Sequence, residues 1–231
     1  ASDGNTGPSP TRGVYVPLVG ALGRVIDEDL ASFEHEHPFR LPTLSEREAL
    51  GRASRAYAAI VRWVAGTEHE ADARERLAAV LAMAGDGDAS IRALTGDRDR
   101  AWQGAALRER VLYADALFAA GRAEEAMREY SAVAEAEWDP AIDRIREDSP
   151  EALRERFVEG HQDERSAYFD AWRGMLTVQL TRPDAAARAG RVLDEVRRLR
   201  EEDWRLGGED VARAFEVIEA RAVELLERRG R

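Results

Sequence analysis

The sequence lacks two residue types on which much enzyme and metal chemistry depends. Its 231 residues include no cysteine, and every one of the 34 basic residues is arginine, so lysine is absent as well. No thiol nucleophile, disulfide or thiolate metal site can therefore form. Without lysine, the chain has no Schiff-base amine and no phosphate-binding P-loop lysine. Several large classes of enzyme are thereby excluded.

Long apolar runs are also missing, as is the alternation of Val, Ile and Thr that is typical of strands. No stretch approaches the ~18 apolar residues of a membrane-spanning helix, so we expect no membrane span. The formal net charge of −11 would repel nucleic acid, so we expect no nucleic-acid partner. Apolar residues make up 44% and charged residues 34% of the chain, and Ala, Leu, Glu and Arg dominate. This composition favours a soluble, acidic, all-α protein.

The beginning of the chain has two parts of different character. Residues 1–13, ASDGNTGPSPTRG, are polar and rich in Gly, Pro and Ser, and we expect an extended tail. Their composition slightly favours an exported, periplasmic protein over a cytoplasmic one. Residues 14–26 are apolar but interrupted by proline and glycine. We expect them to form an irregular strap against the helices or a partner, anchored in part by Val14, Tyr15 and Val16.

Residues 14–231 are predicted to form a single all-helical domain of antiparallel helix pairs joined by short turns. Ser45 and Glu48 have the spacing of a capping box, and Asp88 is placed to cap a short helix. The expected pairs cover residues 45–84, 107–137 and 165–203, and a C-terminal helix covers residues 209–229. Pairs of this kind stack as an α-solenoid or pack as an irregular helical bundle.

The stretch GRAEEAMREYSAVAEA, which begins at Gly121, predicts a close crossing of two helices. Gly121 can adopt the left-handed conformation that ends the preceding helix. Ala126, together with Ala114 on the preceding helix, is small enough for the two backbones to approach near the turn. Tyr130 is then expected to fill a wider gap farther along, and Ala134 to meet the next helix.

Together with the helix before it, this stretch resembles the tetratricopeptide repeat over residues 112–140. The residues at the repeat's characteristic large, small, aromatic and turn positions are Tyr113, Ala114, Leu117, Gly121, Ala126 and Tyr130. A second, weaker copy covers residues 169–199, where Ala189, Leu193 and Val196 would lie on the second helix. Residues 141–162 would form an irregular extra helix pair between the two copies.

The resemblance implies a function as well as a fold. Proteins of this repeat family present a groove to another polypeptide and are seldom catalytic. We therefore expect a noncatalytic interaction module, scaffold or assembly subunit with no cofactor, catalytic residue or metal. One variant of the repeat grips a carboxylate with lysine and asparagine, and it is excluded because lysine is absent and the only asparagine is Asn5.

Two other functions have some support in the sequence. Five tryptophans, at positions 63, 102, 138, 172 and 204, lie near expected helix ends or on apolar stripes, so a small-ligand pocket lined by Trp and Arg is the alternative to a polypeptide groove. His35 and His37 lie between carboxylates in FEHEHPF and could bind zinc or nickel in an extended chain. On a helix these two histidines would point to different faces, which favours a solvated helix end.

The acidic residues suggest where a partner would dock. In residues 123–151, carboxylates far outnumber arginines, and Glu124, Glu125 and Glu129 lie off the expected packing stripe. These three residues are predicted to dock another protein with a basic surface, because complementary charge raises association rates and fixes orientation. The alternative is an acidic surface that only keeps the protein soluble.

Overall fold

A computed structural model of the chain describes residues 14–20, 22, 30, 33, 36–37, 39–96, 106–136, 162–203 and 206–229. These ranges contain α-helices and no β-strand, which confirms the all-α prediction. Within the same ranges, no helix has both the length and the apolar character that crossing a membrane requires. The expected tail over residues 1–13 and the extra helix pair before residue 162 lie outside the described residues.

The expected helix pairs can be compared with the observed helices, which are α2 (Leu44–Trp63), α3 (Glu70–Met83), α4 (Gly87–Thr95), α5 (Leu107–Ala119), α6 (Ala123–Ala134), α9 (Gln162–Thr181), α10 (Ala185–Glu202) and α11 (Glu209–Arg229). The range 45–84 contains α2 and α3, 107–137 contains α5 and α6, and 165–203 contains most of α9 and α10. In addition, α3 forms a tight hairpin with α4, a short helix that the sequence analysis placed in no pair.

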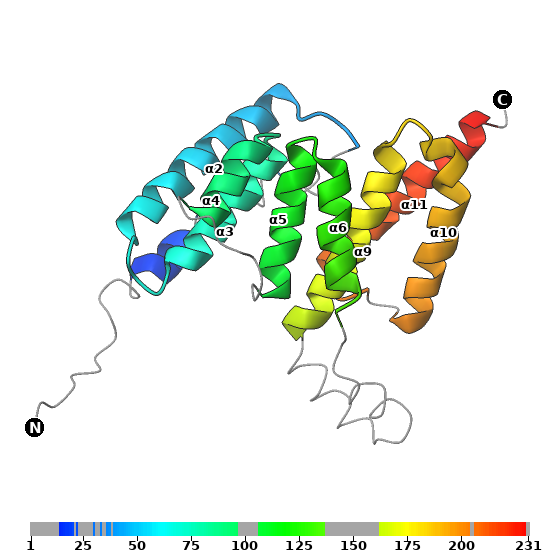
Figure 1. Ribbon diagram of the computed structural model, residues 1–231. Coiled ribbons are helices and arrows are strands. Elements are labelled where there is room, and N and C mark those ends of the chain that lie inside the picture. Colours follow the sequence, from blue (N-terminus) through cyan, green and yellow to red (C-terminus); the bar gives the residue numbers. More distant parts are fainter. Residues whose placement is uncertain are drawn as a thin grey trace, which may run out of the picture.

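The helices follow one another along the molecule and form two rows (Figure 1). The inner row consists of α3, α5, α9 and α11, in which each helix contacts the next. The outer row consists of α4, α6 and α10, and each of these packs against two successive inner helices. At the amino-terminal end, α2 packs against α3. The inner helices therefore contact both one another and the outer helices.

Small residues let paired helices approach closely near their turns. Ala114 and Ala126 are both fully buried on α5 and α6, and Gly121 between them has a φ of 76°. The same twelve-residue spacing separates Ala78 of α3 from Ser90 of α4, where the Ser90 hydroxyl donates to the Ala78 carbonyl at 2.7 Å. The packing device predicted at residues 114–126 is therefore also present between α3 and α4.

The tyrosine in the same stretch packs against a third helix as well as against α5. Tyr130 is fully buried, and its ring lies so close to Gly174 on α9 that a Cβ atom at position 174 would overlap its carbons. Gly174 therefore lets the backbone of α9 approach the ring that was expected to fill the space beside α5 and α6. Ala134 is half-buried in the same core cluster, which includes residues of α9.

Two helices begin two residues earlier than predicted. Thr43, not Ser45, caps α2, and it forms the capping box with Glu46. Asp86, not Asp88, caps α4 by accepting from the Ala89 backbone N–H at 3.1 Å. In both cases the earlier residue has the same capping chemistry, and each additional helical residue adds a backbone hydrogen bond.

The apolar segment after the expected tail is also different from the prediction. Residues 14–20 are helical, so the irregular strap is wrong for them. Tyr15 and Val19, which lie one turn apart, are buried against α2 and α3, whereas Val14 and Val16 are 56% and 59% exposed. The helical period thus puts alternate members of the apolar run on opposite faces.

Candidate functional site

A pocket of about 490 Å³ opens on the inner row. Residues of α3, α5, α9 and α11 all line it, so the row must curve around it. Much of the lining is apolar, including Met83, Val111 and Ile218. Its volume lies within the range of roughly 300–1,000 Å³ that is typical of ligand sites. We call it the inner pocket.

A cluster of charged and polar side chains from three helices lines part of the inner pocket. Arg173 of α9 donates from Nη2 to both carboxylate oxygens of Asp115 on α5, at 3.2 and 3.3 Å. Its Nε donates to Oδ1 of Asp170, one turn earlier on α9, at 3.0 Å. The hydroxyl of Tyr130 on α6 donates to Oδ1 of Asp115. These four residues, the charged cluster, join α5, α6 and α9.

Partial burial changes the proton affinities of the charged cluster. Burial and the charge of Asp115 raise the pKa of Asp170, although Arg173 opposes this rise. Burial also raises the pKa of the Tyr130 hydroxyl well above its usual value, and the charge of Asp115 adds to this. Burial alone would lower the pKa of Arg173, but the two carboxylates raise it. The site therefore combines a protonated phenol, a guanidinium and a carboxyl group whose pKa is raised by burial.

Two residues from the beginning of the chain complete the lining of the inner pocket. His37 and Phe39 reach it from the segment before α2, and Phe39 also packs against the core cluster of α9, α10 and α11. Four residues earlier, Phe33 is fully buried in the core cluster that includes α2 and α3. The segment from Phe33 to Thr43, of which 33, 36–37 and 39–43 are described, thus joins two parts of the core. We call it the N-terminal strap.

An arginine holds the N-terminal strap to the start of α2. Arg40 donates to both carboxylate oxygens of Glu46, at 2.7 and 2.8 Å, and pairs with Glu36. Its guanidinium lies 4.8 Å from the centre of the Phe33 ring. Glu46 also accepts from the Thr43 backbone N–H at 2.7 Å. The hydrogen bonds from Arg40, followed by that from Thr43, lower the pKa of Glu46 to about 2.

This depressed pKa predicts an acid-sensitive contribution to stability. Because Glu46 holds its charge more strongly in the folded state, its contribution is complete above the unfolded pKa of 4.5 and is lost as pH falls towards 2. We expect Glu46→Gln to unfold more easily than the parent at pH 6, and the difference to vanish near pH 2. Urea titrations across this range measure it, with the exposed Glu216→Gln as control. A difference independent of pH would contradict the assignment.

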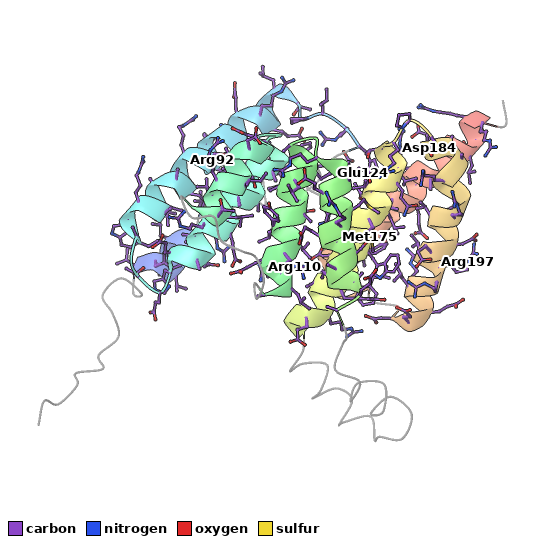
Figure 2. The ribbon with its side chains drawn as sticks, in the orientation of Figure 1. Arg92, Arg110, Glu124, Met175, Asp184 and Arg197 are labelled. Atoms are coloured by element: carbon purple, nitrogen blue, oxygen red, sulfur yellow. The ribbon has the colours of Figure 1, made fainter. Side chains whose placement is uncertain are left out.

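The three predicted docking carboxylates lie on α6, and each has an arginine partner. Glu124 pairs with Arg182 at 2.7 Å, Glu125 with Arg122 at 2.6 Å and Glu129 with Arg110 at 3.0 Å. Glu124 lies at the same end of the helices as Asp184, near the turn between α9 and α10 (Figure 2). These pairs reduce the negative charge available to a partner, and the acidic residues from 137 to 151 lie outside the described residues. Docking through Glu124, Glu125 and Glu129 therefore stays a prediction.

The structure places the predicted anchor residues at the far amino-terminal end of the inner row. Tyr15 donates its hydroxyl to Asp72 at 2.6 Å and stacks on His69 with ring centres 4.4 Å apart, so it serves the fold. Val14 and Val16 are exposed and remain candidates for contact with a partner. None of the three lines the inner pocket.

The structure bears on the two alternatives drawn from the sequence, a metal site at His35 and His37 and a pocket lined by Trp and Arg. His37 lines the inner pocket, where burial lowers its pKa, and His35 lies outside the described residues. Among the residues that are described, no group of three His, Asp or Glu side chains is placed to hold a metal ion. Trp63 and Trp172 are described but do not line the inner pocket, whereas Arg108 and Arg173 do. Among the described residues, the inner pocket is thus lined by arginines, as the small-ligand alternative expects, but not by tryptophans.

Of the charged cluster, sequence reasoning singled out Tyr130, as a packing residue, and missed Asp115, Asp170 and Arg173. Asp115 lies inside the apolar run LYADALFAA, and Asp170 and Arg173 are one helical turn apart in a similar run. A charged residue on an otherwise apolar stripe is a signal that could have identified each of them. Their convergence was not visible, because Asp115 and Arg173 are 58 residues apart.

Comparison with known proteins assigns no family to this geometry. The resemblance of residues 112–140 to the tetratricopeptide repeat remains a prediction that depends on the residues quoted above. The two-row packing of short helix pairs is compatible with it and is not specific to it. No protein-family model matches the chain, and no curated protein or solved structure matches it either.

Proposed function

We propose that the protein is a noncatalytic interaction module that binds a segment of another polypeptide in the inner pocket. The observation that carries this proposal is that one pocket of about 490 Å³ is lined by all four helices of the inner row and by His37 and Phe39 of the N-terminal strap. Its lining combines charged, polar and apolar side chains, which matches the mixture of groups that a polypeptide segment offers.

The polar groups of the pocket support the same function. A peptide backbone offers both N–H donors and C=O acceptors. Arg108 and Arg173 provide donors in the pocket, and Asp170 provides an acceptor. The apolar lining from Met83, Val111 and neighbouring residues can receive an apolar side chain. A pocket with both features suits a polypeptide better than a wholly apolar or wholly charged molecule.

A hydrolytic function has less support. Activation of a serine or threonine hydroxyl requires a base within hydrogen-bonding reach. Ser166, Thr177 and His37 all line the inner pocket. Within the described residues, no hydrogen bond joins His37 to either hydroxyl. We therefore propose binding without catalysis.

A small-molecule ligand is the second candidate, and the observation that favours it is the pocket's volume of about 490 Å³. The two candidates differ in the length of chain that they need. A polypeptide gains affinity as residues are added on both sides of the pocketed side chain, whereas a small molecule gains nothing from such extension. Affinity measured against peptide length separates them.

Selection from a random peptide library tests the proposal. We expect peptides that bind the protein and lose at least tenfold in affinity to Ala214→Trp, which fills the pocket from α11. Ala187→Trp on the exposed face of α10 is the matched control and should bind them as the parent does. A library that yields no binder, or binders indifferent to Ala214→Trp, would overturn the proposal.

A further inference from the structure

The charged cluster has one more negative charge than it has internal cations. Asp115 and Asp170 both contact a single guanidinium, that of Arg173. The other arginine in the lining, Arg108, is exposed, and within the described part of the chain it forms no ion pair with either carboxylate. The charge of Arg108 acts on Asp170 without a direct contact and opposes the rise that burial causes in the pKa of that carboxyl. By direct contact, the two carboxylates of the charged cluster therefore share one guanidinium.

The hydrogen bonds identify which oxygen is available to a ligand. Both oxygens of Asp115 accept hydrogen bonds, from Arg173 and from Tyr130. Asp170 accepts through Oδ1 only, and no described residue donates to its Oδ2. Oδ2 of Asp170 is therefore open to a ligand, and a cationic donor is the strongest hydrogen-bond partner of a carboxylate oxygen.

The walls of the inner pocket fit the rest of such a ligand. Met83, Val111 and Phe118 form apolar surface on the α3 and α5 sides of the cluster. Arginine and lysine carry their charge on an aliphatic stem, which packs favourably on apolar and aromatic surface. An anionic ligand would instead meet two carboxylates at the same place, and a wholly apolar ligand would leave Oδ2 of Asp170 without a donor.

We infer that the inner pocket recognises a cationic side chain, arginine or lysine, of the bound polypeptide, with Asp170 as its principal acceptor and Asp115 as a second negative charge. This inference rests on the proposed function and specifies the chemistry of the partner. It also moves the expected contact with a basic partner from the outer face of α6 to the inner row. Burial, together with the charge of Asp115, raises the pKa of Asp170 against the opposing charge of Arg173, and a bound cation would counter that rise.

Four blocked amino acids test the inference on the full chain. They are the N-acetyl amides of arginine, lysine, norleucine and glutamate, titrated by NMR while the side-chain carboxyl signal of Asp170 is followed. We expect the arginine and lysine amides to bind at least tenfold more tightly than norleucine amide, and the glutamate amide not to bind. The pKa of Asp170 should fall when the cation binds, because an adjacent positive charge favours the carboxylate.

A pair of variants assigns the effect to one carboxylate. Asp170→Asn should weaken the arginine amide about tenfold. Asp194→Asn, at an exposed position on the outer-row helix α10, should leave it unchanged. Equal binding of norleucine and arginine amides, tighter binding of glutamate amide, or an indifferent Asp170→Asn would each overturn the inference. Library peptides that need the pocket but show no preference for Arg or Lys would overturn it while leaving the proposed function intact.

Discussion

Gly174→Ala is expected to destabilise the protein by about 1–3 kcal/mol, even though alanine is the better helix former. The added Cβ would overlap carbons of the Tyr130 ring. That ring is fully buried, and its hydroxyl donates to Asp115, so it cannot move aside without losing packing and a charged hydrogen bond. Thermal or urea unfolding of the purified variant measures the loss.

A second helical glycine provides the control for this experiment. Gly190 lies within α10, and a Cβ there would meet nothing within 4 Å. Gly190→Ala should therefore stabilise the protein by about 0.5–1 kcal/mol, the usual gain from replacing glycine within a helix. If Gly174→Ala is as stable as the parent or more so, the Tyr130 ring is not seated against α9.

Arg173→Met is expected to have a comparable or larger effect, about 2–3 kcal/mol of destabilisation. Removing the guanidinium leaves Asp115 and Asp170 as two neighbouring negative charges without the cation that both contact. Breaking a fully buried pair costs about 3–5 kcal/mol, and the 23% exposure of the Arg173 side chain reduces that cost. Methionine retains much of the aliphatic volume, so the loss reports mainly on charge.

The pH dependence of Arg173→Met separates charge from packing. Without Arg173, both carboxylates would hold their protons more strongly in the folded state than in the unfolded state. Because the carboxyl pKa values would be raised in the folded variant, the variant should recover stability as pH falls. Its free energy of unfolding should therefore approach that of the parent below about pH 5. Arg197→Met is the control, because the Arg197–Asp194 pair is 70% and 74% exposed and should contribute under about 0.5 kcal/mol. A loss equal to the control's would show that Arg173 does not hold the cluster together.

Local chemistry made much of the helical architecture predictable from the sequence. Gly121, Ala114 and Ala126 define a helix pair because a left-handed turn and two small residues are needed where backbones cross. The predicted start of α2 was less accurate, because Thr43 with Glu46 and Ser45 with Glu48 offer equivalent capping boxes. The chain uses the pair of Thr43 and Glu46, and Arg40 hydrogen-bonds to the Glu46 carboxylate. This contact with Arg40 could not be read from the sequence.

The inner pocket was not predictable in the same way. Its charged cluster combines residues of α5, α6 and α9, and no local rule relates Asp115 to Arg173 across 58 positions. The expected docking surface on α6 also forms ion pairs that depend on the fold. Arg128 lies four residues after Glu124, a spacing that predicts a pair on the same helix, but in the fold the Glu124 carboxylate meets Arg182, which is also 58 positions away. Periodicity identifies the buried face of a helix, whereas the pairing of charges depends on how helices pack.

The central claim is that the inner row holds the polypeptide-binding site. Its most direct test is the structure of the protein bound to a peptide selected from the library, by crystallography or by NMR. We predict that the peptide contacts α5 and α9 inside the inner pocket, with a basic side chain against Asp170. A peptide bound to the outer-row helices α4, α6 and α10, with the inner pocket unchanged, would contradict this account.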